Sequence, residues 1–211
     1  MVPFDNTSGV CKMLYEIDRE ENGTSNEEFV QMSEEECARR QSKETDYMVE
    51  LLLNKLREKD LLKNTVLVIF TDHYLFTLKD QSILSKYKNT SNNLINNTPW
   101  FIWSSNIDDK KINKVTSQLN ILPTIINLFG ISYSSNDYVA EDALSNKYSP
   151  IVFFDDYSWY DGDTYVEGGV RKSGKKISKD KLEEKNEYVN YASKKNDLTL
   201  KFNYFKKQSS E

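Results

Sequence analysis

Asp72 and His73 are adjacent residues that follow an unbroken apolar run, Val66–Phe70. A carboxylate oxygen and an imidazole nitrogen held side by side can both bind one divalent metal ion. An Asp-His pair after a strand can also cap the next helix or form a surface turn. His73 is the only histidine in the sequence, and a structural histidine is less needed at the rim of a sheet. The metal-binding interpretation is therefore favoured.

The apolar run predicts the strand that positions this pair. Its residues do not alternate with polar ones, which is typical of a strand buried on both faces in a parallel sheet covered by helices. In open α/β sheets, ligands bind beyond the carboxyl ends of the strands. Upstream, Ser33 and Glu36 form a capping-box pattern, and apolar residues at helical spacing predict a packing helix over residues 33–60. A helix, a short turn and a strand together predict an α/β fold.

Further elements are predicted downstream of the Asp-His pair. They are a long polar loop over 74–97, a strand over 98–103, a helix over 118–130 with Pro123 in its first turn, a strand over 149–154, a hairpin around Asp161-Gly162, an exposed helix over 179–191 and a short strand over 198–205. From Arg171 onward, the polar composition predicts a solvated tail.

Composition excludes some classes of function. The chain has 211 residues, a net charge of -5 and 29% charged residues, so it lacks the basic footprint of a nucleic-acid-binding protein. No apolar run approaches the twenty or so residues of a membrane span, and Met1–Asp5 does not begin a signal peptide. Cys11 and Cys37 fit no zinc-binding spacing. A disulfide in an oxidising compartment and two unpaired thiols both stay open.

Two segments carry a family resemblance. Asn64–Tyr74, Asn-Thr-Val-Leu-Val-Ile-Phe-Thr-Asp-His-Tyr, resembles the late metal-binding strand of the lipoteichoic acid synthase (phosphoglycerol transferase) family, in the sulfatase-like branch of the alkaline phosphatase superfamily. Gln118–Gly130 resembles the sulfatase segment Asp-Ile-x-Pro-Thr-Ile-Leu-x-Leu-x-Gly, with Asn120 in place of its aspartate. Leu75 stands where the synthases have a glycine, so the substrate details of this loop do not carry over.

The resemblance covers roughly residues 1–170 and implies a fold. We expect an α/β architecture: a partial alkaline-phosphatase/sulfatase-like sheet covered by helices, with a small C-terminal β-hairpin subregion. Residues 1–170 would form the C-terminal portion of a sulfatase-like catalytic domain, and residues 171–211 a polar extension. Pro3-Phe4 matches the end of a family segment whose histidine would fall on or before Met1. We therefore expect the chain to open inside the domain.

The resemblance also implies an activity. In the synthases, one divalent metal ion, most often Mn²⁺, is held by a threonine nucleophile, a glutamate, an aspartate and a histidine. Asp72 and His73 match the last two, and Zn²⁺, Mg²⁺ or Ca²⁺ are the alternative metals. No segment matches the threonine or the glutamate, so we expect little or no activity from this chain alone.

The implied partner is a phosphatidylglycerol-type lipid head group at the extracytoplasmic face of a bacterial membrane. The membrane would be reached only through an upstream anchor, and no nucleic acid is expected. Two alternatives remain. The domain is a sulfatase or phosphodiesterase that hydrolyses soluble esters, or it is a non-catalytic remnant or interaction domain that has kept the fold and lost the site.

Overall fold

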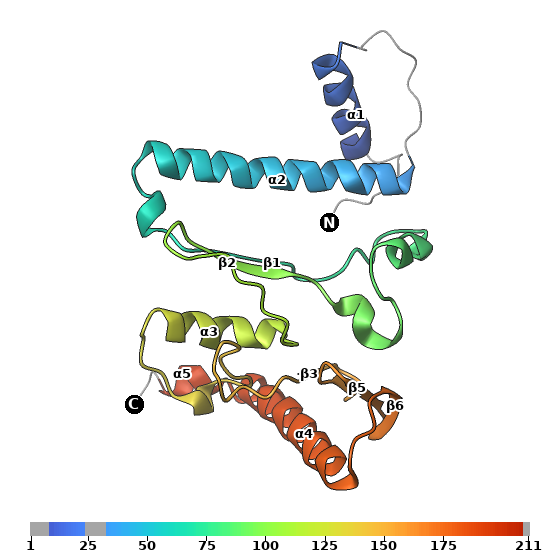
Figure 1. The fold of residues 1–211 in the computed structure, drawn as a ribbon, viewed down its shortest axis with the longest axis vertical. Coiled ribbons are helices and arrows are strands. Elements are labelled where there is room, and N and C mark those ends of the chain that lie inside the picture. Colours follow the sequence, from blue (N-terminus) through green and yellow to red (C-terminus); the bar gives the residue numbers. More distant parts are fainter. Residues whose placement is uncertain (1–8, 24–32, 209–211) are drawn as a thin grey trace. The chain divides into compact units, whose positions relative to one another are not determined.

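The computed structural model describes residues 9–23 and 33–208, and it divides the chain into two compact units, Met1–Asp109 and Lys110–Glu211 (Figure 1). Helices and strands occur in both units, in keeping with a mixed α/β chain. The Pro3-Phe4 segment lies outside the described residues. Within the described part, no helix combines the length and apolar character that a membrane span requires.

Unit 1 contains two helices, α1 (Gly9–Glu21) and α2 (Glu34–Glu58). Ser33 caps α2, because its hydroxyl accepts a hydrogen bond from the backbone N–H of Glu36 at 3.1 Å. Three glutamates in the first turn complement the positive end of the helix dipole. At the other end, Asp60 adopts φ +53° and the Leu61 N–H reaches the Leu56 carbonyl oxygen at 2.9 Å. The helix predicted over 33–60 is confirmed.

The role predicted for the apolar face of α2 needs correction. Packing was expected along the whole face, yet the side chains of Met48 and Leu52 are 59% and 43% exposed. The buried residues of α2 are Cys37 and Ala38, near its start. The helix is therefore held mainly at its N-terminal end. Other apolar residues of unit 1, such as Ile69 and Phe101, are exposed themselves and do not cover the rest of this face.

The strand before the Asp-His pair is β1 (Leu67–Phe70), and it pairs antiparallel with β2 (Trp100–Trp103). Both strands were predicted, but burial of β1 on both faces in a parallel sheet is wrong. Phe70 is 52% exposed, and among the described strands β1 has one neighbour. Burial of both faces requires layers on both sides of a sheet, and this two-stranded ribbon lacks them. A partial sulfatase-like sheet thus stays a prediction.

The loop after the Asp-His pair is more ordered than its polar sequence indicates. It contains two 3₁₀ helices, Gln81–Lys86 and Asn92–Asn96. Leu78, Ile83 and Leu84 are buried and pack with Ala38 of α2. The loop is therefore docked on the first turns of α2.

Unit 2 contains an antiparallel sheet of four strands in chain order: β3 (Val152–Phe153), β4 (Trp159–Tyr160), β5 (Thr164–Glu167) and β6 (Val170–Gly174). The predicted hairpin is confirmed, since β4 and β5 flank Asp161-Gly162. A Cβ atom at Gly174, where φ is +84°, would lie 2.0 Å from the Asp163 carbonyl oxygen. Only glycine fits at this point of the β5–β6 pairing.

The helix α4 (Lys179–Lys201) lies beside this sheet (Figure 1). Its Val189 is 1% exposed and packs with Trp159 and Val166, which are fully buried. The helix predicted over 179–191 is confirmed and extends further, but its predicted exposure is wrong at Val189 and Ala192, which are buried. The strand predicted over 198–205 is wrong, because these residues continue α4 and then form α5 (Tyr204–Gln208). The solvated tail expected from residue 171 is also wrong, since β6 pairs with β5 and α4 contributes to the core.

The segment predicted as a helix over 118–130 is a 3₁₀ turn, Gln118–Asn120, followed by α3 (Ile121–Leu128). Pro123 lies in the first turn of α3, as predicted, where its missing N–H costs no hydrogen bond. Gly130 has φ +64°, the left-handed conformation that ends many helices.

Candidate metal site

The structure places Asp72 and His73 immediately after the end of β1, as the sequence predicted. The Asp72 side chain is 85% exposed and that of His73 is 32% exposed. The Nε2 atom of His73 lies 3.3 Å from the Oδ2 atom of Asp72. Neighbours in an extended strand normally point to opposite faces, so this approach requires the chain to leave the strand conformation after Phe70.

The other ring nitrogen of His73 has a defined partner. Nδ1 lies 2.7 Å from the carbonyl oxygen of Tyr74. A carbonyl oxygen only accepts hydrogen bonds, so Nδ1 carries the proton and, in the neutral ring, Nε2 presents its lone pair. The imidazole also meets the Phe76 ring edge to face, with centroids 4.8 Å apart. Backbone and aromatic contacts thus orient His73 as outer contacts orient metal-bound histidines.

The distance between the two candidate ligand atoms suits a shared ion. Atoms 3.3 Å apart, each about 2.1 Å from one metal ion, subtend an angle of about 104° at that ion. This value lies between the octahedral and tetrahedral ideals. The mixed oxygen and nitrogen donor set suits several divalent transition metals. Asp72 and His73 therefore have the geometry of two neighbouring ligands of one ion.

Two ligands are fewer than a closed protein site uses. Across residues 9–23 and 33–208, no group of three or more His, Cys, Asp or Glu side chains is arranged to hold a metal ion. Zinc sites commonly use three or four protein ligands. The described residues therefore do not complete such a site around Asp72 and His73.

The loop that follows the pair is held by two glutamates of α2. The carboxylate of Glu34 accepts hydrogen bonds from the backbone N–H groups of Lys79 and Asp80, at 2.7 and 3.0 Å. The carboxylate of Glu35 accepts hydrogen bonds from Lys86 and Tyr87, and these contacts, that from Lys86 first, lower its pKa. No local sequence pattern indicates these contacts, because the partners lie more than forty residues away in the chain.

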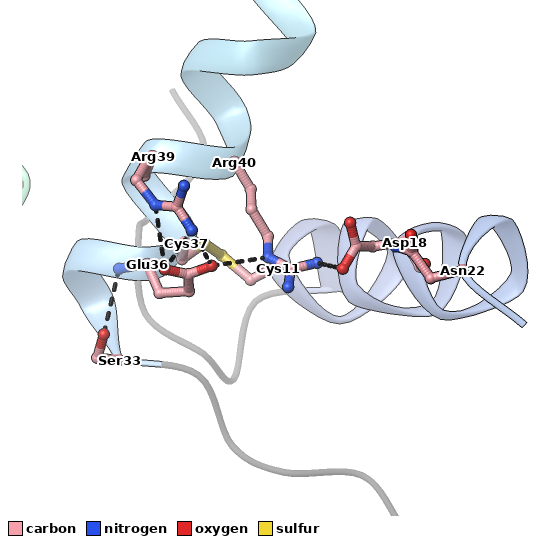
Figure 2. A network of polar contacts seen from close by, with 8 residues as sticks. All are labelled: Cys11, Asp18, Asn22, Ser33, Glu36, Cys37, Arg39 and Arg40. Carbon is pink, nitrogen blue, oxygen red and sulfur yellow. Dashed lines mark hydrogen bonds and ion pairs between the residues drawn. A yellow bond between two sulfur atoms is a disulfide. The ribbon is translucent and has the colours of Figure 1, made fainter. Parts of the chain in front are cut away.

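The same helical turn is attached to α1 by a disulfide between Cys11 and Cys37, whose Cα atoms lie 5.6 Å apart (Figure 2). Of the two alternatives left open by the sequence, the structure has the disulfide. Beside it, Arg40 of α2 joins the two helices, because its NH1 atom lies 2.8 Å from Asp18 of α1. Its Nε atom lies 3.2 Å from Glu36 of α2 itself. One end of α2 thus holds α1 on one side and the loop after the candidate ligands on the other.

Two comparisons with known proteins match this part of the chain. The sulfatase family profile matches residues 15–131, a range that includes α2, β1, the Asp72–His73 pair, β2 and α3. Lipoteichoic acid synthase 2 of Bacillus subtilis (strain 168) is 23% identical over 117 residues. That alignment covers 52% of this chain and 18% of the relative, so the chain spans a small part of that protein.

The profile match extends over more than half of the 211 residues. It also covers the two segments whose residues carry the resemblance, Asn64–Tyr74 and Gln118–Gly130. The chain belongs to the sulfatase family.

Proposed function

We propose that Asp72 and His73 are two ligands of one divalent metal ion in a phosphoglycerol transferase of the lipoteichoic acid synthase type. The 3.3 Å approach of Asp72 Oδ2 to His73 Nε2 carries the proposal. Mn²⁺ is the first choice by family resemblance, with Zn²⁺, Mg²⁺ and Ca²⁺ as alternatives. The similarity to lipoteichoic acid synthase 2 supports the transferase class.

The residues of this chain would hold and orient the ion. Asp72 supplies a carboxylate oxygen, and His73 supplies Nε2 because the Tyr74 carbonyl oxygen keeps the proton on Nδ1. A bound divalent ion supplies Lewis-acid polarisation of a phosphate ester and lowers the pKa of a coordinated hydroxyl group. Glu34 and Glu35 hold the loop that follows His73, through Lys79, Asp80, Lys86 and Tyr87.

The proposed substrate is a phosphatidylglycerol-type lipid head group. The threonine nucleophile and the glutamate ligand of the family would come from sequence outside these 211 residues, so this chain alone is expected to show little or no turnover. The proposed location is the extracytoplasmic face of a bacterial membrane, reached through an anchor outside this chain. The Cys11–Cys37 disulfide supports that location, because disulfides persist in oxidising compartments.

Hydrolysis of sulfate esters or phosphodiesters is the second candidate, and the sulfatase profile match favours it. The two activities differ in their products. The native protein, purified from its own cells and supplied with Mn²⁺, would release diacylglycerol and transfer glycerol phosphate if it is a transferase. Cleavage of an aryl sulfate or a generic phosphodiester, without transfer from phosphatidylglycerol, would favour the hydrolase.

Metal binding by the 211-residue chain tests the site without turnover. Free Mn²⁺ is measured by electron paramagnetic resonance during a titration of the wild type, Asp72→Ala and His73→Ala. We expect each variant to bind Mn²⁺ at least about tenfold more weakly, since a direct ligand matters no less than its outer contacts. Asp46→Ala is the matched control, because Asp46 is an exposed carboxylate on α2.

An unchanged titration for Asp72→Ala would show that Asp72 is not a ligand. An equal loss in Asp46→Ala would show that Mn²⁺ binds exposed carboxylates without selectivity. Either result would overturn the metal site and leave the non-catalytic interpretation of this chain.

A further inference from the structure

A cavity of about 420 Å³ lies in unit 2. Its walls come from the end of α3, the segment 133–147 and one residue of α4, Tyr188. This volume falls within the range of small-molecule sites, roughly 300–1,000 Å³. A neighbouring hollow of about 370 Å³ shares Asn127 and Tyr133 with it. The space therefore suits a small ligand, with room for it to extend.

The wall of the cavity is held by part-buried polar contacts. Asp142 is 7% exposed, and its carboxylate accepts a hydrogen bond from the side-chain amide of Asn127 at 2.7 Å. The preceding residue, Glu141, is fixed through its carbonyl oxygen by the Asn120 amide at 2.8 Å. On the α4 side, Lys195 donates to the Tyr138 carbonyl oxygen at 2.7 Å. A wall fixed in this way is preorganised, so binding loses little conformational entropy.

Three tyrosines line the cavity: Tyr133, Tyr138 and Tyr188. The rings of Tyr133 and Tyr138 meet edge to face, with centroids 5.2 Å apart. A tyrosine offers a flat apolar face and a hydroxyl group, and its rigid side chain loses little entropy on binding. Sugar rings have apolar C–H faces bordered by hydroxyl groups, so they match such a lining.

The charges around the cavity favour a neutral ligand. Burial, and then the negative charge of Glu141, raise the pKa of the Tyr188 phenol, so that this group remains a hydrogen-bond donor. The same charge opposes a phosphate or sulfate group. Lys147 also lines the cavity, and its ammonium group opposes a cation. The carboxylate acceptors and tyrosine hydroxyl donors of the wall match the hydroxyl groups of a ligand, because each ligand hydroxyl group both donates and accepts hydrogen bonds.

We propose that this cavity binds a sugar ring, with the tyrosines contacting its C–H faces and the exposed carboxylate of Glu141 accepting hydrogen bonds from its hydroxyl groups. The site lies wholly within unit 2 and needs neither the metal ion nor the transferase reaction. Failure of the sugar-binding proposal would therefore leave the proposed function standing, and failure of the proposed function would leave the sugar-binding proposal standing.

Saturation-transfer difference NMR on the full chain tests the site, with methyl β-glucopyranoside as the probe and no metal added. We expect transfer to the ring protons of the glucoside. Tyr188→Ala and Tyr133→Ala should each weaken binding by roughly tenfold, as expected for central aromatic anchors. Tyr191→Ala is the matched control, because Tyr191 also lies on α4, is 66% exposed and does not line the cavity. Circular dichroism verifies that each variant is folded.

Three results would overturn the proposal. The first is the absence of transfer to the glucoside in the wild type. The second is an equal loss of binding in Tyr191→Ala. The third is tighter binding of glycerol 3-phosphate or tetramethylammonium than of the glucoside, because the cavity would then be an ionic site.

Discussion

The two sheets of this protein differ in what covers them. The β1–β2 ribbon of unit 1 leads to the candidate ligands, yet Phe70 and Phe101 on it are 52% and 57% exposed. In the sheet β3–β6 of unit 2, Trp159 and Val166 are fully buried against Val189 of α4. The candidate metal ligands thus follow a sheet with little core, whereas the sheet of unit 2 is packed on one side by a buried apolar cluster.

The difference shows two ways of fixing local structure. Unit 2 relies on apolar burial, which is non-directional and grows with the area removed from water. Unit 1 has a small apolar cluster around Ala38 among its described residues and adds directional contacts at the start of α2: the disulfide, the ion pairs of Arg40 and the carboxylates that hold the loop. Such contacts position a few groups accurately, but each one can be removed by a single substitution. The two units should therefore respond differently to perturbation.

The largest expected effect is that of Trp159→Ala. The indole is fully buried and donates a hydrogen bond to the Asn186 side chain at 2.8 Å. Its removal should destabilise unit 2 by about 3–5 kcal/mol. The matched change in unit 1, Phe101→Ala, should cost less than about 1 kcal/mol, because that ring is largely exposed. Amide hydrogen exchange reports each unit separately, and equal losses for the two variants would refute the contrast in burial.

The next effect concerns the disulfide. Reduction with dithiothreitol should destabilise the α1–α2 pair by about 3 kcal/mol, since a loop of 26 residues is released. Because Cys37 adjoins the turn that carries Glu34, the amides of Lys79 and Asp80 should also exchange faster, whereas α4 should not change. The double variant Cys11→Ser, Cys37→Ser is the control and should not respond to the reductant. Unchanged exchange at Lys79 and Asp80 would show that the loop is held independently of α1.

The features that the sequence predicted correctly depend on neighbouring residues. The Ser33 cap, the helix over 33–60 and the turn at Asp161-Gly162 depend on residues close in the chain, and all three are confirmed. The placement of Asp72 and His73 after a strand also followed from neighbouring residues. Their approach to 3.3 Å did not, because it depends on how the backbone turns after Phe70.

The wrong or missing predictions concern features that depend on residues far apart in the chain. An unbroken apolar run cannot reveal how many layers will cover it, so the exposure of β1 was missed. Over 198–205 the apolar residues alternate, which favours a strand, but the helix that Ser178 caps continues through Lys201. The cavity was missed because Tyr188 lies fifty residues beyond Tyr138, and no periodic pattern links the two.

The smallest effect distinguishes the carboxylates of the two units. Burial opposes ionisation of Asp161, but hydrogen bonds from Lys185 and from the backbone N–H groups of Thr164 and Asp163 outweigh it, so its pKa is lowered. A lowered pKa in the folded state adds stability above the unfolded value, about 4, and this stability is lost as the pH falls through the folded pKa. Unit 2 should therefore be less stable at about pH 2.5 than at about pH 6.

In Asp161→Asn this loss should be smaller, and the variant should be the less stable protein at the upper pH. The counterpart in unit 1, Glu35→Gln, should change the pH response less, although hydrogen bonds from Lys86 and Tyr87 lower the pKa of Glu35 as well. The reason is solvent screening, because exposed ion pairs contribute little to the free energy of unfolding. The Asp161 side chain is better shielded, at 11% exposed. Urea unfolding at both pH values measures the difference. A larger change for Glu35→Gln would show that the contacts of α2, and not the shielded pair of unit 2, control the acid sensitivity of the protein.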